Sequence, residues 1–124
     1  MKIEYLIEFK KELKKLEKKY PTLSEDLDHF ISYGLPKIID NKIIEEMPII
    51  SKLGIINPEI RKVTKFACRS IYGRGAKSGI RIIFAYDREK KVVKFIEIYH
   101  KNKKEIENRD RIYKYFQSIQ NPNS

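Results

Sequence analysis

Residues 62–101 constrain the fold of this chain more than any other stretch, because their pattern predicts three consecutive β-strands. The segment reads KVTKFACRSIYGRGAKSGIRIIFAYDREKKVVKFIEIYHK, and the predicted strands span residues 62–72, 79–87 and 91–99. Glycines punctuate the first connection, and residues 87–91 form the second turn. The middle strand, IRIIFAY, is almost continuously apolar, as expected for a strand that is covered on both faces.

Cations interrupt the apolar pattern of these strands. Period-two geometry predicts that Lys65 and Arg69 share one face of the first strand, and Arg81 lies within the second strand. Because a charge is costly to bury, such residues indicate a solvated face that meets an anionic partner. If the faces of the neighbouring strands align, these three residues form a basic patch across the sheet.

Helical periodicity flanks the predicted strands. Residues 2–7 predict a short first strand, and apolar residues from Phe9 to Tyr20 predict a helix. A second helix should begin within TLSEDL, where Thr22 has capping-box spacing and Ser24 is an alternative N-cap, and end or kink at Gly34 and Pro36. These two helices are expected to form an antiparallel hairpin.

The rest of the chain completes a single α+β domain over residues 1–119. Residues 40–60 predict irregular chain with room for one short strand, because prolines and a glycine divide their apolar pairs. Residues 103–119 predict a final helix, and residues 120–124 a disordered tail.

The charge balance favours an anionic partner. The chain has 124 residues, with 27 Lys and Arg against 17 Asp and Glu, a net charge of +10. Nucleic acid is the commonest partner of such a basic domain, although the excess charge could serve solubility alone.

The cysteine and histidine content argues against other classes of protein. Cys68 is the only cysteine, which excludes an internal disulfide and is typical of a reducing cytoplasm. Together with His29 and His100 it is too scattered for a zinc site, so we expect no metal and no cofactor. No stretch approaches the roughly 20 apolar residues of a membrane span. The expected location is therefore the cytoplasm, without a membrane partner.

Three segments carry a resemblance to a known family. The first is EYLIEFKKELKKLEKKYPTLSEDLDHF, and the others are KSGIRIIFAYD and KVVKFIEIYHKNKKE. In order and spacing they resemble the RelE/ParE superfamily of toxins from type II toxin–antitoxin modules, in particular its RelE/HigB/YafQ-like mRNA interferase branch. The resemblance implies a small, mainly antiparallel β-sheet with an N-terminal α-helical hairpin packed on one face and a C-terminal helix.

The resemblance also implies a function. It points to a metal-independent mRNA endoribonuclease that acts in association with the ribosome and inhibits translation. Its partners would be mRNA, the ribosome and a cognate acidic antitoxin protein. Two alternatives stay open: a ParE-like gyrase-directed inhibitor, and a non-catalytic basic RNA-binding module, since the sequence departs from the family pattern after residue 100.

Metal-free RNA cleavage needs a base near the 2′-oxygen, an acid near the 5′-leaving oxygen, and cations for the phosphorane charge. Arg81 matches the strand arginine of the cleaving branch and is the predicted charge stabiliser. Lys65 and Arg69 correspond loosely to basic residues on the preceding strand. His100 is the side chain here that titrates near neutrality, so it could serve as acid or base. These four are the candidate catalytic residues.

Four further cations are expected to bind the RNA backbone: Arg74, Lys77, Lys101 and Lys62. Tyr72 and Tyr86 could stack on bases, or pack at the edge of the core. Each of these residues also has a structural interpretation: Arg81 could pair with an acid, His100 could be a plain surface residue, and each cation could simply be solvated.

Overall fold

The computed structural model describes residues 1–120, with side chains described through residue 116. It is an α+β fold, as predicted. The elements follow one another as β1 (Lys2–Tyr5), α1 (Ile7–Glu17), α2 (Leu23–His29), the π turn η1 (Phe30–Gly34), α3 (Leu35–Asp40), the 3₁₀ turn η2 (Ile43–Glu46), β2 (Glu59–Val63), β3 (Ile80–Asp87), β4 (Val92–His100) and α4 (Arg109–Gln120). Apart from Gln120, the predicted tail lies outside the described residues.

The sheet has four strands in the order β1-β4-β3-β2. β1 runs parallel to β4, and the other two pairs are antiparallel. The strands predicted over residues 79–87 and 91–99 are confirmed as β3 and β4, which lie in the middle of the sheet. Their hairpin brings Ile80 opposite His100 and Arg81 opposite Tyr99.

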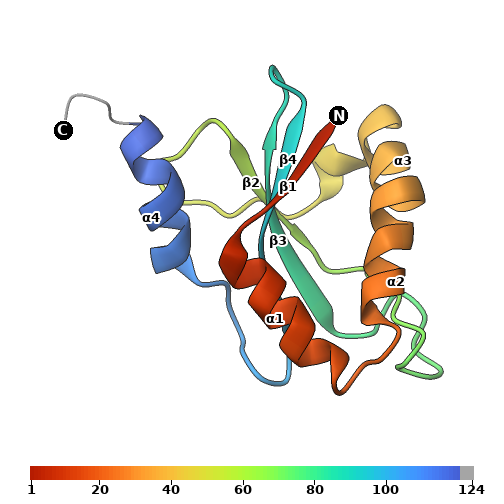
Figure 1. Cartoon of the computed structure of the whole chain (residues 1–124). Helices are drawn as coiled ribbons and strands as arrows, with labels where there is room; N and C mark the ends of the chain where they lie inside the picture. Colours follow the sequence, from red (N-terminus) through yellow and green to blue (C-terminus); the bar gives the residue numbers. More distant parts are fainter. Residues whose placement is uncertain (121–124) are drawn as a thin grey trace.

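Helices cover the sheet from two sides. In Figure 1, α4 lies on the opposite side of the sheet from α2 and α3, and α1 descends before the chain turns back upward into α2. Phe9 of α1 is fully buried, with its ring centroid 5.4 Å from that of Phe95 on β4. Burying such a side chain stabilises the fold by roughly 1.5–3 kcal/mol. This aromatic contact fixes α1 across β4.

The helical backbone continues through Gly34 and Pro36 without ending there. α2, η1 and α3 follow one another directly, and the Leu35 N–H donates to the Phe30 carbonyl, five residues earlier. A proline has no N–H to donate and its ring crowds the preceding turn, so the wider π turn accommodates Pro36 where a regular turn would not.

The strand predicted over residues 62–72 is wrong, because β2 ends at Val63 and residues 64–79 form a long loop. The backbone N–H of Arg69 donates to Asp26 and that of Ser70 donates to Thr22, which lie 43 and 48 residues away in sequence. These side chains replace a neighbouring strand as partners, so the segment is drawn toward α2. The same bonds explain why Thr22 makes no capping hydrogen bond to α2, contrary to the prediction.

The final helix begins at Arg109, six residues later than predicted. Glu97 is buried on β4, and its carboxylate accepts hydrogen bonds from the Lys104 side chain and the Asn108 N–H. The Asn108 side chain in turn accepts the Arg111 N–H and thereby caps α4. Residues 101–108 are held as a loop by these contacts, which leaves Ile106 exposed.

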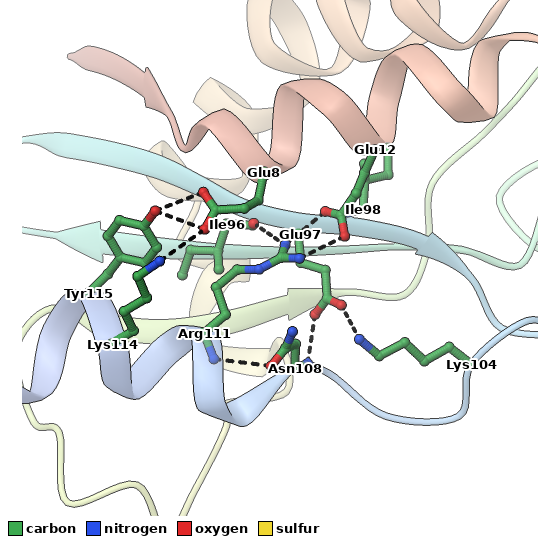
Figure 2. Close-up of polar contacts among 10 residues, drawn as sticks. All are labelled: Glu8, Glu12, Ile96, Glu97, Ile98, Lys104, Asn108, Arg111, Lys114 and Tyr115. Carbon is green, nitrogen blue, oxygen red and sulfur yellow. Dashed lines mark hydrogen bonds and ion pairs between the residues drawn. The ribbon is translucent and has the colours of Figure 1, made fainter.

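A polar network joins α1, β4 and α4 where β1 stops (Figure 2). β1 pairs with β4 only as far as Phe95, so the next backbone groups on that edge lack a strand partner. Arg111 donates to the Ile96 carbonyl at 2.9 Å and binds both carboxylate oxygens of Glu12 at 2.8 and 2.9 Å. Glu12 also accepts the Ile98 N–H at 3.4 Å. The Arg111–Glu12 ion pair therefore supplies the hydrogen bonds that a longer β1 would otherwise make to this edge of β4.

Candidate nucleic-acid interface

An open groove of about 380 Å³ lies where the long loop meets the end of β4. The loop contributes one wall, and the turn that follows β4 contributes the other. The residues that line the groove are Ile71, Arg74, Lys77, Ser78, His100, Lys101 and Asn102. Four of the eight predicted site residues therefore meet here: Arg74, Lys77, His100 and Lys101.

His100 is held by hydrogen bonds at both ring nitrogens. Nε2 lies 3.0 Å from the Ser78 carbonyl, and Nδ1 accepts the Asn102 N–H at 3.1 Å. These partners assign the neutral tautomer with the proton on Nε2. Burial lowers the pKa of His100, and the charges of Lys19 and Lys101 lower it further, against the opposing effect of the Ser78 carbonyl. The imidazole is therefore neutral at physiological pH, and a proton transfer would first require one of its nitrogens to leave its backbone partner.

Gly79 makes room for this ring. Its φ is +89°, and a methyl group placed on it would lie 2.7 Å from Nε2 of His100. Glycine is the residue that accepts such a φ without strain, and it alone lets the backbone approach the imidazole so closely. The buried hydroxyl of Ser78 bonds the Phe66 carbonyl, which fixes this end of the loop.

The cations of the groove have no ion-pair partner among the described side chains. Arg74, Lys77 and Lys101 are exposed, and none of them forms an ion pair with a described side chain. Because the three belong to one groove, they add to a common positive potential within the ~8 Å over which charges act at physiological salt. Such a rim attracts a polyanion.

Arg81 lies beside the groove, on β3. Its guanidinium donates to the Thr64 carbonyl at 2.8 Å and makes no ion pair with a described carboxylate, so the alternative of an acid partner is not observed. Tyr99 is its cross-strand neighbour, and the buried Tyr99 hydroxyl has no hydrogen-bond partner among the described residues. Burial, together with the charges of Glu97 and Glu107, raises the pKa of Tyr99 to about 12.

The remaining three predicted site residues lie elsewhere, and the basic patch expected across the strands does not form. Arg69 is bound to Asp26 and Glu25, each at 2.7 Å, because the loop carries it to α2. Lys62 pairs with the buried Glu107 at 3.6 Å. Lys65 is exposed on the loop.

The sequence pattern did not single out Gly79 as a contact of His100, nor Ser78 and Asn102 as its partners. A glycine just before an apolar strand marks a turn, which is the one local signal for Gly79. The bonds to Ser78 and Asn102 use backbone groups, which leave no trace in residue type.

Comparison with known proteins gives no family: no protein-family model matches the chain, and no curated protein sequence matches it. Within residues 1–120, no helix is both long enough and apolar enough to cross a membrane.

Proposed function

We propose that this protein is an RNA-binding toxin of the RelE type, the toxin component of a type II toxin–antitoxin module that cleaves mRNA on the ribosome. The single observation that carries the proposal is the groove, in which a neutral histidine lies with three cations that pair with no described carboxylate. Phosphate contacts dominate the affinity of proteins for nucleic acid, and unpaired cations supply them without first breaking an ion pair. The order of the elements, with two helical segments before a β2-β3-β4 meander and a helix after it, supports the RelE-like arrangement.

The chemistry would divide between His100 and the cations. In cleavage by the 2′-hydroxyl, the Nδ1 lone pair of His100 can accept the hydroxyl proton once the Asn102 N–H moves aside. The 2′-oxygen then bonds to the phosphorus, the bond from phosphorus to the 5′-oxygen breaks, and the 5′-oxygen takes a proton from water. Arg74, Lys77 and Lys101 would hold the phosphates, and Arg81 would add positive charge near the reacting phosphorus. An acidic antitoxin would oppose the same cations and thereby block the groove.

One observation favours a second candidate, a non-catalytic RNA-binding module. Both nitrogens of His100 are engaged by backbone groups, and three of the four predicted catalytic residues, Arg81, Lys65 and Arg69, are not among the residues that line the groove. The groove would then bind RNA through its cations alone.

Cleavage of mRNA in a reconstituted translation reaction tests the proposal. The test variant is Arg74→Ala/Lys77→Ala, and the matched control is Lys2→Ala/Lys90→Ala. The control removes the same charge near the β3–β4 turn, at the opposite end of that hairpin from His100. We expect cuts with wild type and control, and at least a tenfold slower reaction with the groove variant.

Binding of RNA to the isolated protein separates the two candidates. Losing two phosphate contacts should lower the slope of log affinity against log salt by about 1.4, at roughly 0.7 per contact with a single strand. Intact mRNA in the translation reaction, with RNA binding that depends on the groove, would replace the nuclease by the binding module. Absence of both activities in wild type would refute an RNA function.

A further inference from the structure

Among the described residues, Tyr72 is the most exposed large hydrophobic side chain, with 91% of its surface accessible. It lies in the long loop, one residue from Gly73 and two from Arg74. Two residues of extended chain span at most about 7 Å, so the Tyr72 backbone lies at the rim of the basic groove. In Figure 1 this green loop projects beside α2, away from the core of the sheet.

The loop is anchored on both sides of Tyr72. The Thr22 and Ser70 hydroxyls lie 2.6 Å apart, the Ile71 N–H donates to the Cys68 carbonyl, and the buried Ser78 fixes the far end. Anchors at both ends limit the entropy that the loop loses when a ligand binds. Tyr72 is thus presented by a supported loop.

The ring of Tyr72 also has its faces free. It belongs to none of the aromatic pairs among the described residues. Tyr33 differs, because this second exposed tyrosine, 61% accessible, packs on His29 with centroids 4.9 Å apart. Exposing an aromatic ring to water is unfavourable. A bare ring on the loop that carries Arg74 and Lys77, neither of which pairs with a described carboxylate, therefore indicates a ligand with both π faces and negative charge.

We infer that Tyr72 is a stacking platform for an unpaired base of single-stranded RNA whose phosphates lie in the groove of Arg74, Lys77 and Lys101. This inference rests on the proposed function and specifies its substrate: a single strand or an unpaired end. Bases within a duplex are stacked on one another and cannot reach the ring, whereas bases of a single strand can be splayed out onto it.

The test measures binding of wild type, Tyr72→Ala and Tyr72→Phe to one RNA probe by fluorescence anisotropy. The probe is a 12-nucleotide RNA with 2′-O-methyl sugars, which blocks attack by the 2′-oxygen, and it carries 2-aminopurine at one position. It is used alone and annealed to its complement. Tyr33→Ala is the matched control, because it removes another exposed tyrosine that lies outside the groove.

We expect Tyr72→Ala to weaken single-strand binding by about 5- to 100-fold, since stacking on an aromatic ring contributes that much per base. The affinity of Tyr72→Ala for the duplex should differ from that of wild type by less than twofold. The affinity of the Tyr33→Ala control for the single strand should also differ by less than twofold. Tyr72→Phe should retain wild-type affinity, and wild type should quench 2-aminopurine fluorescence where Tyr72→Ala does not.

Two results would overturn the inference, and they are distinguishable. If wild type binds the single strand and Tyr72→Ala binds it equally well, or if Tyr72→Ala weakens duplex and single-strand binding to the same degree, the stacking role fails while the RNA function stands. If wild type binds neither form of the probe, the proposed function fails and the inference fails with it.

Discussion

Replacing Gly79 with alanine should destabilise the protein through His100 as well as through the backbone. The backbone at Gly79 has a φ of +89°, and the added methyl group would lie 2.7 Å from Nε2 and 2.9 Å from Cε1 of the imidazole. Such contacts are shorter than carbon and nitrogen atoms tolerate, so the ring must move. Because His100 is stacked on Tyr20 with centroids 5.9 Å apart, it cannot move without giving up that contact.

The two costs can be estimated separately. A positive φ costs an alanine about 1–2 kcal/mol. Displacing the ring would break the Nε2 hydrogen bond to the Ser78 carbonyl, which costs about 1 kcal/mol. It would also disturb the stacking of His100 on Tyr20, which costs about 0.5–1 kcal/mol more. The total for Gly79→Ala is therefore about 2.5–4 kcal/mol.

Urea denaturation followed by circular dichroism tests this estimate. Gly54→Ala is the matched control, because its φ is +73° and nothing lies within 4 Å of the added methyl group, so it should cost only the backbone term of about 1–2 kcal/mol. In a His100→Ala background Gly79→Ala should also cost only that term, which makes the coupling energy about 1.5–2 kcal/mol. An equal cost in both backgrounds would refute the close packing of Gly79 against His100.

Two further predictions concern the contacts that hold the fold. Arg111→Ala should lower the free energy of unfolding by about 2–3 kcal/mol, because it leaves the Ile96 carbonyl and the partly buried Glu12 carboxylate without their partner. The control Lys114→Ala removes only an exposed ion pair with Glu8 at 3.9 Å and should lower the free energy of unfolding by less than about 0.5 kcal/mol. Equal effects in urea titrations would show that the edge of β4 does not need Arg111. Burial raises the pKa of Asp26, but the hydrogen bonds from Arg69 and Thr22 outweigh burial and leave that pKa below its ordinary 3.8. The stability that Asp26 contributes is therefore present above pH 3.8 and lost as the pH falls through the lower pKa of the folded state. Asp26→Asn should lower the free energy of unfolding by about 2 kcal/mol at pH 7, and its stability should fall less steeply than that of wild type as the pH is lowered. Asp28→Asn, on the exposed side of the same helix, should leave the profile of stability against pH unchanged, and parallel profiles for all three proteins would contradict the role of Asp26.

Much of the sheet and of α1 could be predicted because the signals are local. The apolar run IRIIFAY and the alternation of KVVKFIEIY depend only on neighbouring residues, and they locate β3 and β4 to within a residue or two. The grouping of His100 with Lys101 also follows from the chain itself. Arg74 and Lys77 were expected near RNA on the strength of their glycine loop, and the structure places them in the same groove as His100.

The assignment of the other cations depended on partners far away in sequence. Residues 64–72 have the composition of a strand, but Thr22 and Asp26 accept hydrogen bonds from their backbone across separations of 48 and 43 residues, respectively, and convert the segment into a loop. The same contacts take Arg69 out of the candidate site.

The fold class, the two central strands and the excess positive charge can all be predicted from residue composition and hydrophobic periodicity. Which cations stay without an ion pair follows from contacts that form only in the folded chain. That choice depends on which carboxylates the fold brings within reach: Asp26 beside Arg69 and Glu107 beside Lys62, but none beside Arg74, Lys77 or Lys101 among the described side chains.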